Sequence, residues 1–146
     1  MIGRMFRVTI AVRADDIDAN GHVRGPAYLA YADHARWSCV RAAGIDPAGL
    51  TARRIGPVNL ETTVRFHREL VPGGEVSVSC EFQWGEGKTS RVVQEFRAPD
   101  GVLVAEVSSV SGLLDLDRRR LLPDPGAHWR ELATHPELLG LAPKTG

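Results

Sequence analysis

The sequence predicts an α+β fold in which an antiparallel β-sheet wraps around one long central α-helix. One stretch of apolar residues, from Tyr28 to Ala43, repeats at the spacing of a helix. Five other stretches alternate apolar and polar residues, as half-buried strands do. The last four of these strands follow one another mostly through short turns, which favours antiparallel pairing. Because one long helix must cover the apolar faces of all the strands, we expect the sheet to curl around it.

Length and charge indicate a single domain with no nucleic-acid or membrane partner. The chain has 146 residues, so we expect one domain over 1–146, with a core to about residue 122 and a C-terminal tail over 123–146. Lys and Arg total 18, as do Asp and Glu, which leaves no net charge to attract nucleic acid or an anionic membrane. Arg residues interrupt the N-terminal apolar stretch that a signal peptide would need, so a cytoplasmic location is expected.

The first expected elements are a strand, a loop and the long helix. Apolar and polar residues alternate from Phe6 to Arg13 and predict the strand, whereas the polar stretch 14–23 predicts the loop. Pro26 suits the first turn of a helix, where its missing N–H costs nothing. Gly44 is expected to end the helix in a left-handed cap. The inner face of this helix is mostly small residues, which let it lie close against a curved sheet.

Four more strands are expected after a loop that contains Pro47, Gly49 and Gly56. They are Leu60–His67, Val76–Trp84, Ser90–Arg97 and Val102–Asp115. The turn signals between them are VPGG at 71–74, GEGK at 85–88 and PDG at 99–101. A short helix is expected in the tail, around Trp129–Ala133. The free edges of such a sheet would favour edge-to-edge pairing in a dimer.

Neither the cysteines nor the histidines are spaced for a disulfide framework or a metal site. Cys39 falls in a helical apolar pattern and Cys80 in a strand-like one, and we interpret both as buried, unpaired side chains. The histidines show no metal-ligand spacing, so no metal is expected.

The stretch DDIDANGHV, at 15–23, places Asp18, Asn20 and His22 directly before the predicted helix. Two interpretations are open. The first is an ordinary loop, because Asp and Asn tolerate left-handed backbone and Gly21 supplies a turn. The second is a reaction site, because the first N–H groups of a helix lack partners and carry the positive end of its dipole.

The chemistry that fits the second interpretation is acyl transfer, and hydrolysis in particular. Since Pro26 has no N–H, the donors at the helix start are the amides of Val23, Arg24, Gly25 and Ala27. Gly25 is the most approachable of them, because it has no side chain. Such a donor polarises a carbonyl and stabilises the oxyanion that forms on attack. Asp18, ionised at neutral pH, could attack the carbonyl or activate water, with Asn20 and His22 assisting.

This stretch, together with AYLAYADHARW at 27–37, resembles the thioesterase signature of the hot-dog fold superfamily. That signature is D-x-D-x-x-x-H-V followed by a helix with Y-L-x-Y and A-R-W. The likeness is to the 4-hydroxybenzoyl-CoA thioesterase-like and long-chain acyl-CoA thioesterase families and to the acyl-ACP thioesterases. The motif covers residues 15–37, and the strand order with VPGGEVSV agrees over nearly the whole chain.

The resemblance implies a hot-dog fold and thioester hydrolysis, with Asp18 as nucleophile or general base and an amide near Gly25 polarising the carbonyl. The acyl-ACP branch places an Asp-x-Asn-x-His set here, which Asp18, Asn20 and His22 match. It also implies an acyl-CoA or acyl-carrier-protein substrate, no cofactor beyond the coenzyme A of the substrate, and a homodimer or homotetramer. Relatives usually have H-V-N-N at these positions, whereas this chain has H-V-R-G, with Arg24 and Gly25 in place of the two asparagines. Both Asn side chains are therefore lost, and Arg24 could instead bind an acidic group of the substrate.

Four further residues are candidate substrate contacts, each with an ordinary structural alternative. Tyr28 could line an acyl pocket or simply belong to the core. Glu61 and Thr63 share a strand face and could approach a partner's site, or could be exposed strand residues. Arg91 is one of several cations that could bind the phosphates of coenzyme A, or is an isolated surface charge.

Three other assignments stay open on sequence grounds. Asp33 on the helix could be the carboxylate, although an ion pair with Arg36 is favoured. A dehydratase of the same fold would need a different signature, with His and Asp on the helix, which we do not find. A non-catalytic acyl-CoA-binding or regulatory protein is the stronger rival, because the Asn pair is lost.

Overall fold

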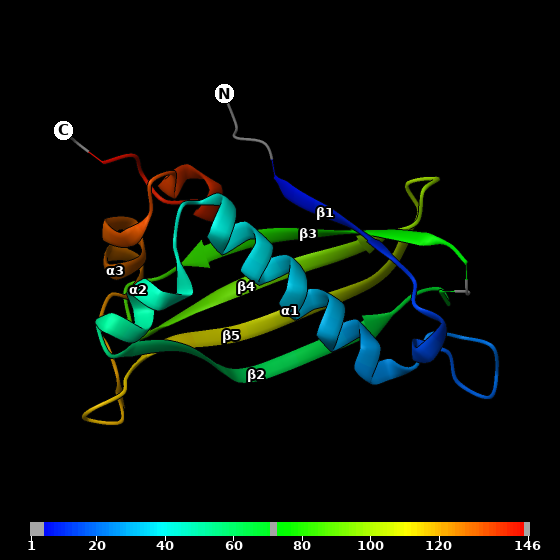
Figure 1. Cartoon of the computed structure of the whole chain (residues 1–146), viewed down its shortest axis with the longest axis horizontal. Helices are drawn as coiled ribbons and strands as arrows, with labels where there is room; N and C mark the ends of the chain where they lie inside the picture. The colour runs from blue at the N-terminus through cyan, green and yellow to red at the C-terminus, as the bar shows by residue number, and fades with distance from the viewer. Residues whose placement is uncertain (1–4, 71–72, 145–146) are drawn as a thin grey trace.

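The computed structural model describes residues 5–70 and 73–144. One antiparallel sheet has the strand order β1-β3-β4-β5-β2, with the short β6 paired to β5. The strands are β1 (Phe6–Ala11), β2 (Ile55–Phe66), β3 (Glu75–Trp84), β4 (Thr89–Arg97), β5 (Leu103–Asp115) and β6 (Arg120–Leu121). Helix α1 (Gly25–Ala42) crosses one face of this sheet (Figure 1). The predicted fold class is therefore confirmed.

Helix α1 begins and ends as its sequence predicts. Pro26 lies in the first turn, and Gly44 just beyond the helix has a φ of 89°. That left-handed backbone favours glycine. The buried side chains of the helix are Ala27, Tyr28, Tyr31, Ala32, Ala35, Cys39 and Val40. Because most of them are small, the helix packs directly on β1 and β3.

Strand β2 begins at Ile55 rather than at the predicted Leu60. Gly56 and Pro57 look like loop residues in sequence, but β2 is an edge strand, where proline is tolerated. A register shift between Asn59 and Glu61 also interrupts its pairing with β5.

A short helix, α2 (Pro47–Ala52), replaces the loop that was predicted there. Asp46 accepts a hydrogen bond from the backbone N of Ala48 at 2.9 Å, so Asp46-Pro47 is an N-cap followed by a first-turn proline. The signal was present in the sequence, but one and a half turns are too short for an apolar period. The predicted turn at 71–74 lies partly outside the described residues.

The tail closes one end of the structure. The expected helix is α3 (Pro125–Leu132), followed by the 3₁₀ helix η2 (Pro136–Leu139). Trp129 and Leu139 are buried, and the indole of Trp84 on β3 donates to the carbonyl of Leu139 at 2.7 Å. Figure 1 places α3 and α2 at one end of the sheet and the loop before α1 at the other.

Cys39 and Cys80 are both buried and unpaired, as interpreted. A hydrogen bond with the Cys80 thiol, together with burial, raises the pKa of the Cys39 thiol far above its ordinary value. Within residues 5–70 and 73–144, no helix has the length and apolar character to cross a membrane.

Candidate active site

The loop before α1 is a closed turn organised by Asp18. Its Oδ1 accepts hydrogen bonds from the backbone N of Asn20 at 2.9 Å and of His22 at 3.2 Å. The backbone N of Asp18 donates to the carbonyl of His22, and that of Gly21, whose φ is 78°, donates to the carbonyl of Asp18. The turn that Asp18, Asn20 and Gly21 predict is therefore present in the structure. Oδ2 of Asp18 makes no hydrogen bond within the described part of the chain, and the side chain is half-buried.

One of the four candidate amides at the helix start is free. The backbone N of Val23 donates to Leu70 at 3.0 Å, that of Arg24 to Asp16 at 2.9 Å, and that of Ala27 to Arg24 at 3.0 Å. Among the described residues, the N–H of Gly25 has no such partner. It is therefore the donor that remains for a ligand at the positive end of the helix.

An open cavity of about 490 Å³ lies beside this amide. It is lined by His22, Val23, Gly25, Tyr28, Phe66, His67, Arg68 and Glu69. A Cβ on Gly25 would lie 4.0 Å from Cζ of Phe66, with no other atom nearer, so a ligand can approach the backbone there. Tyr28 forms the buried floor, where burial raises the pKa of its phenol, and its ring meets Phe66 edge-on at 5.0 Å.

The structure brings His22, Gly25 and Tyr28 of the predicted set to this cavity. Asp18 and Asn20 do not line it. Asp18 is connected to the cavity wall through the N–H of His22 that it accepts. Within a single chain, His22 therefore lines the cavity and the carboxylate of Asp18 lies behind it.

Glu69 is a site residue that sequence reasoning missed. Its Oε2 lies 2.5 Å from Nε2 of His22, and both side chains line the cavity. The contact holds because the carbonyl of Leu70, next in the chain, accepts from the N of Val23. No local pattern marks an acid just beyond a strand, so only the tertiary structure identifies it.

Arg24 lies beside Asp16 rather than on the cavity wall. Its Nη2 is 3.6 Å from Oδ1 of Asp16, whose Oδ2 accepts a hydrogen bond from the hydroxyl of Tyr31 at 2.8 Å. Asp16 therefore joins the 3₁₀ helix η1 (Ala14–Asp16) to α1 and to the cation that replaces the family's asparagine.

Glu61, Thr63 and Arg91 also lie away from the helix-start cavity. Thr62 bonds with Ser109 on the helix side of the sheet, so the alternation of the strand directs Glu61 and Thr63 to the opposite face. Arg91 donates to the hydroxyl of Ser108 at 2.6 Å and is exposed. Their predicted contacts with substrate remain predictions.

Comparison with known protein families shows which family the chain belongs to. A model described as the thioesterase-like superfamily matches residues 12–137. No curated protein matches the chain.

Several solved structures have the same fold. YbaW, a probable thioesterase from Escherichia coli, is 24% identical with a TM-score of 0.73 over 81% of this chain and 89% of its own. Slr0204, a 1,4-dihydroxy-2-naphthoyl-CoA thioesterase from Synechocystis, is 15% identical with a TM-score of 0.76, covering 84% and 90%. SAV2348 from Staphylococcus aureus, determined in complex with CoA, is 20% identical with a TM-score of 0.79, covering 100% and 98%. The chain has the hot-dog fold, and it belongs to the thioesterase-like superfamily.

Proposed function

We propose that this protein hydrolyses an acyl thioester, with acyl-CoA as the favoured substrate, at the cavity beside the start of α1. The observation that carries the proposal is the N–H of Gly25, which has no partner among the described residues and lies on the wall of an open cavity. A thioester carbonyl that accepts this N–H is polarised by the hydrogen bond and by the helix dipole. The same donor stabilises the oxyanion when the carbonyl is attacked.

Asp18 supplies the base or the nucleophile in this proposal. As a base, its carboxylate takes a proton from water, the hydroxide adds to the carbonyl, and the thiolate leaves with a proton returned to it. As a nucleophile, it would add to the carbonyl and expel the thiolate, which takes up a proton, as a mixed anhydride forms; water then opens the anhydride to release the acid and restore the carboxylate. Because the carboxylate does not line the cavity in the single chain, action through a water molecule is favoured over direct attack.

His22 assists from the cavity wall. Glu69 contacts one ring nitrogen of His22 and so orients the imidazole. Asn20 holds the turn that positions Asp18 through its backbone N. The proposed reaction needs no metal or redox cofactor, since the charge that develops on the oxygen is met by backbone N–H and dipole.

Coenzyme A is favoured as the carrier because two structural neighbours are described with it. SAV2348 was determined in complex with CoA, and Slr0204 is described as acting on a CoA thioester. We also propose a homodimer or a homotetramer, built by pairing through the exposed edge strand β2.

The test is thiol release from short, long and aromatic acyl-CoAs by the wild type and by Asp18→Asn. Asn keeps the oxygen that accepts from the N of Asn20 and of His22, so the turn is retained. Loss of the carboxylate should lower kcat by about 10²–10⁴-fold. Asp15→Asn is the matched control, because Asp15 is exposed and paired with Arg13, and its activity should be unchanged.

Full activity in Asp18→Asn would remove Asp18 from this role. If the wild type releases no thiol from any acyl-CoA, acyl-phosphopantetheine carriers are tried next. Tight acyl-CoA binding without hydrolysis of either class would instead favour a binding or regulatory protein.

A further inference from the structure

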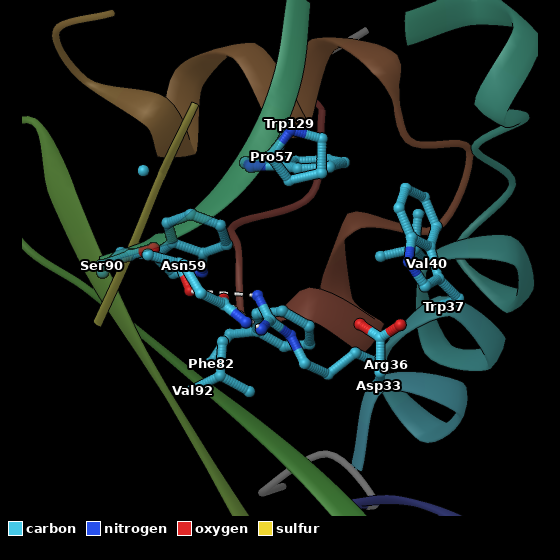
Figure 2. A pocket seen from close by; sticks show the side chains of 13 residues that line it. Asp33, Arg36, Trp37, Val40, Pro57, Asn59, Phe82, Ser90, Val92 and Trp129 are labelled. Carbon is cyan, nitrogen blue, oxygen red and sulfur yellow. Dashed lines mark hydrogen bonds between the residues drawn. The ribbon is translucent and has the colours of Figure 1, made fainter. Parts of the chain in front are cut away.

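A second cavity lies under the middle of α1, away from the helix start. It encloses about 110 Å³ between α1, the sheet and α3. Trp37, Phe82 and Trp129 contribute apolar walls, and Arg36, Asn59 and Ser111 contribute polar ones. Figure 2 shows Arg36 extending from α1 across this space toward Asn59 on β2. A half-buried charged side chain thus lies in a cavity whose other walls are partly aromatic and partly polar.

The three polar side chains that bond with one another in this cavity, those of Arg36, Asn59 and Ser111, carry more donors than acceptors. Arg36 Nη1 donates to Oδ1 of Asn59 at 2.6 Å, and Nη2 donates to Oγ of Ser111 at 3.1 Å. Oγ of Ser111 donates in turn to the same Oδ1 of Asn59 at 2.9 Å. A guanidinium has five N–H donors and an amide two. Among the described residues, the remaining N–H groups of Arg36 and the amide nitrogen of Asn59 have no acceptor.

The positive charge of Arg36 forms no ion pair among the described residues, although the negative charge of Asp33 opposes the lowering of its pKa by burial. Asp33, one turn earlier on α1, is exposed at the rim of the cavity, and no ion pair joins it to Arg36 in the part of the chain that the structure describes (Figure 2). The ion pair favoured from sequence is therefore replaced by contacts with two neutral residues. Burial lowers the pKa of the guanidinium, but an arginine stays charged in proteins.

A smaller adjoining cavity of about 100 Å³ extends along α1 toward Leu29 and shares Arg36 and Asn59 with the first. Gln94 on β4 lines it and is fully buried. The amide nitrogen of Gln94 donates to the carbonyl of Ala32 at 2.8 Å, whereas its Oε1 has no partner among the described residues. A hydrocarbon chain in this space would leave the donors of Arg36 and the oxygen of Gln94 unpaired and desolvated, which is unfavourable.

We propose that the acyl group of the substrate carries a carboxylate at the end remote from the thioester, and that Arg36 and Asn59 bind it. A planar carboxylate matches the fork of a guanidinium, and Asn59 adds a further donor. Arg36 follows Gly25 by roughly 16 Å along the helix axis at the usual rise per residue, so an acyl chain whose thioester lies at Gly25 must run along α1 for its far end to reach Arg36. This inference rests on the proposed thioesterase function.

The first experiment compares kcat/KM for hexanoyl-, octanoyl- and dodecanoyl-CoA with that for the matching ω-carboxyacyl-CoAs. The wild type should prefer the ω-carboxy form of the best chain length by about tenfold or more. Arg36→Met should abolish or reverse this preference, and Arg36→Lys should retain part of it, because lysine keeps the charge without the fork. Arg41→Met is the control, since Arg41 is exposed on the same helix and should leave the preference intact.

A second experiment separates this inference from the proposed function. Calorimetry compares the binding of monomethyl dodecanedioate with that of methyl dodecanoate, which lacks the ω-carboxylate, and the half-ester should bind about tenfold more tightly to the wild type. If no thioester is hydrolysed but this selectivity holds and Arg36→Met removes it, the carboxylate site stands and the hydrolase proposal fails.

If plain acyl-CoAs are hydrolysed at least as well as their ω-carboxy forms and monomethyl dodecanedioate binds no more tightly than methyl dodecanoate, the inference is overturned while hydrolysis stands. Both wild-type comparisons need no variant, so they remain decisive even if Arg36→Met does not fold.

Discussion

Single residues decide what the start of α1 offers to a ligand. Backbone carbonyls of Asp16, Arg24 and Leu70 take up three of the four candidate amides, and the N–H of Gly25 is left over. The absence of a side chain at Gly25 keeps that N–H open to the cavity. The position of Arg24 follows from the same arrangement, because its side chain extends toward Asp16.

Tyr31 is the residue through which the loop before the helix is attached to it. Its hydroxyl donates to Asp16 at 2.8 Å and accepts from the N of Arg13 at 3.2 Å. Tyr31→Phe removes a hydrogen bond to a carboxylate and should lower the free energy of unfolding by about 1.5–3 kcal/mol, as measured by urea titration at pH 8.

The pH dependence of that loss is a second readout. Burial raises the pKa of the Tyr31 phenol above its ordinary value of 10.0, so its contribution is complete below about pH 10 and is lost as the pH rises through the folded-state pKa. Stability should therefore fall as the pH rises above about 10 in the wild type and fall less in Tyr31→Phe. Equal decreases in stability with rising pH in the two proteins would show that ionisation of Tyr31 does not cause the decrease.

At the scale of the elements, the end of α1 does not accommodate a side chain at Gly44 without strain. Gly44 has left-handed backbone, and a Cβ there would lie 2.5 Å from Oγ1 of Thr134. Gly44→Ala should cost about 1–3 kcal/mol of unfolding free energy, since strain and a clash add. Gly49→Ala in α2 is the control, because its Cβ meets nothing within 4 Å and it should be neutral or stabilising by up to about 1 kcal/mol. Similar losses in both variants would contradict the assignment.

The elements that could be predicted from sequence are those with a long, clean period. Strand β3 alternates over its whole length, and α1 keeps its spacing from Ala27 to Val40. The start of β2 was missed because Gly56 and Pro57 indicate a loop unless the strand is known to lie at an edge. Strand β6 has two residues, which is too short for any periodicity.

Some residues of the candidate site can likewise be predicted from the sequence, and others cannot. Asp18, His22 and Gly25 form one local motif, so sequence alone predicts them. Glu69 and the cluster around Arg36 join residues from distant segments, and nothing in either segment encodes the partner.

At the scale of the whole molecule, β2 leaves one edge of the sheet unpaired in the single chain. Leu60 on this strand is 52% exposed, and Phe66 is 58% exposed. A long edge strand with exposed apolar side chains is a template for pairing with a second copy. This arrangement supports the proposed dimer.

Size-exclusion chromatography with light scattering should give a molar mass that is either twice or four times the chain mass of 15.9 kDa. Leu60→Lys should weaken the dimer by at least about tenfold, because it buries a charge at the interface. Val102→Lys is the control, since Val102 is exposed outside β2 and should leave the mass unchanged. A wild-type monomer at micromolar concentration would contradict the proposed assembly.

The central claim is that the N–H of Gly25 binds the thioester oxygen, and it is tested by removing that one donor. Arg24 has φ −69° and ψ 149°, which a following proline requires, and Gly25→Pro deletes the N–H. Because residue 25 itself precedes Pro26, circular dichroism and thermal unfolding must first show that the variant keeps the wild-type fold. Gly25→Ala retains the N–H and is the matched comparison. Kinetics on the best thioester should show kcat reduced about 10²–10³-fold in Gly25→Pro and less than about tenfold in Gly25→Ala. Equal activity in the two folded variants would contradict the account.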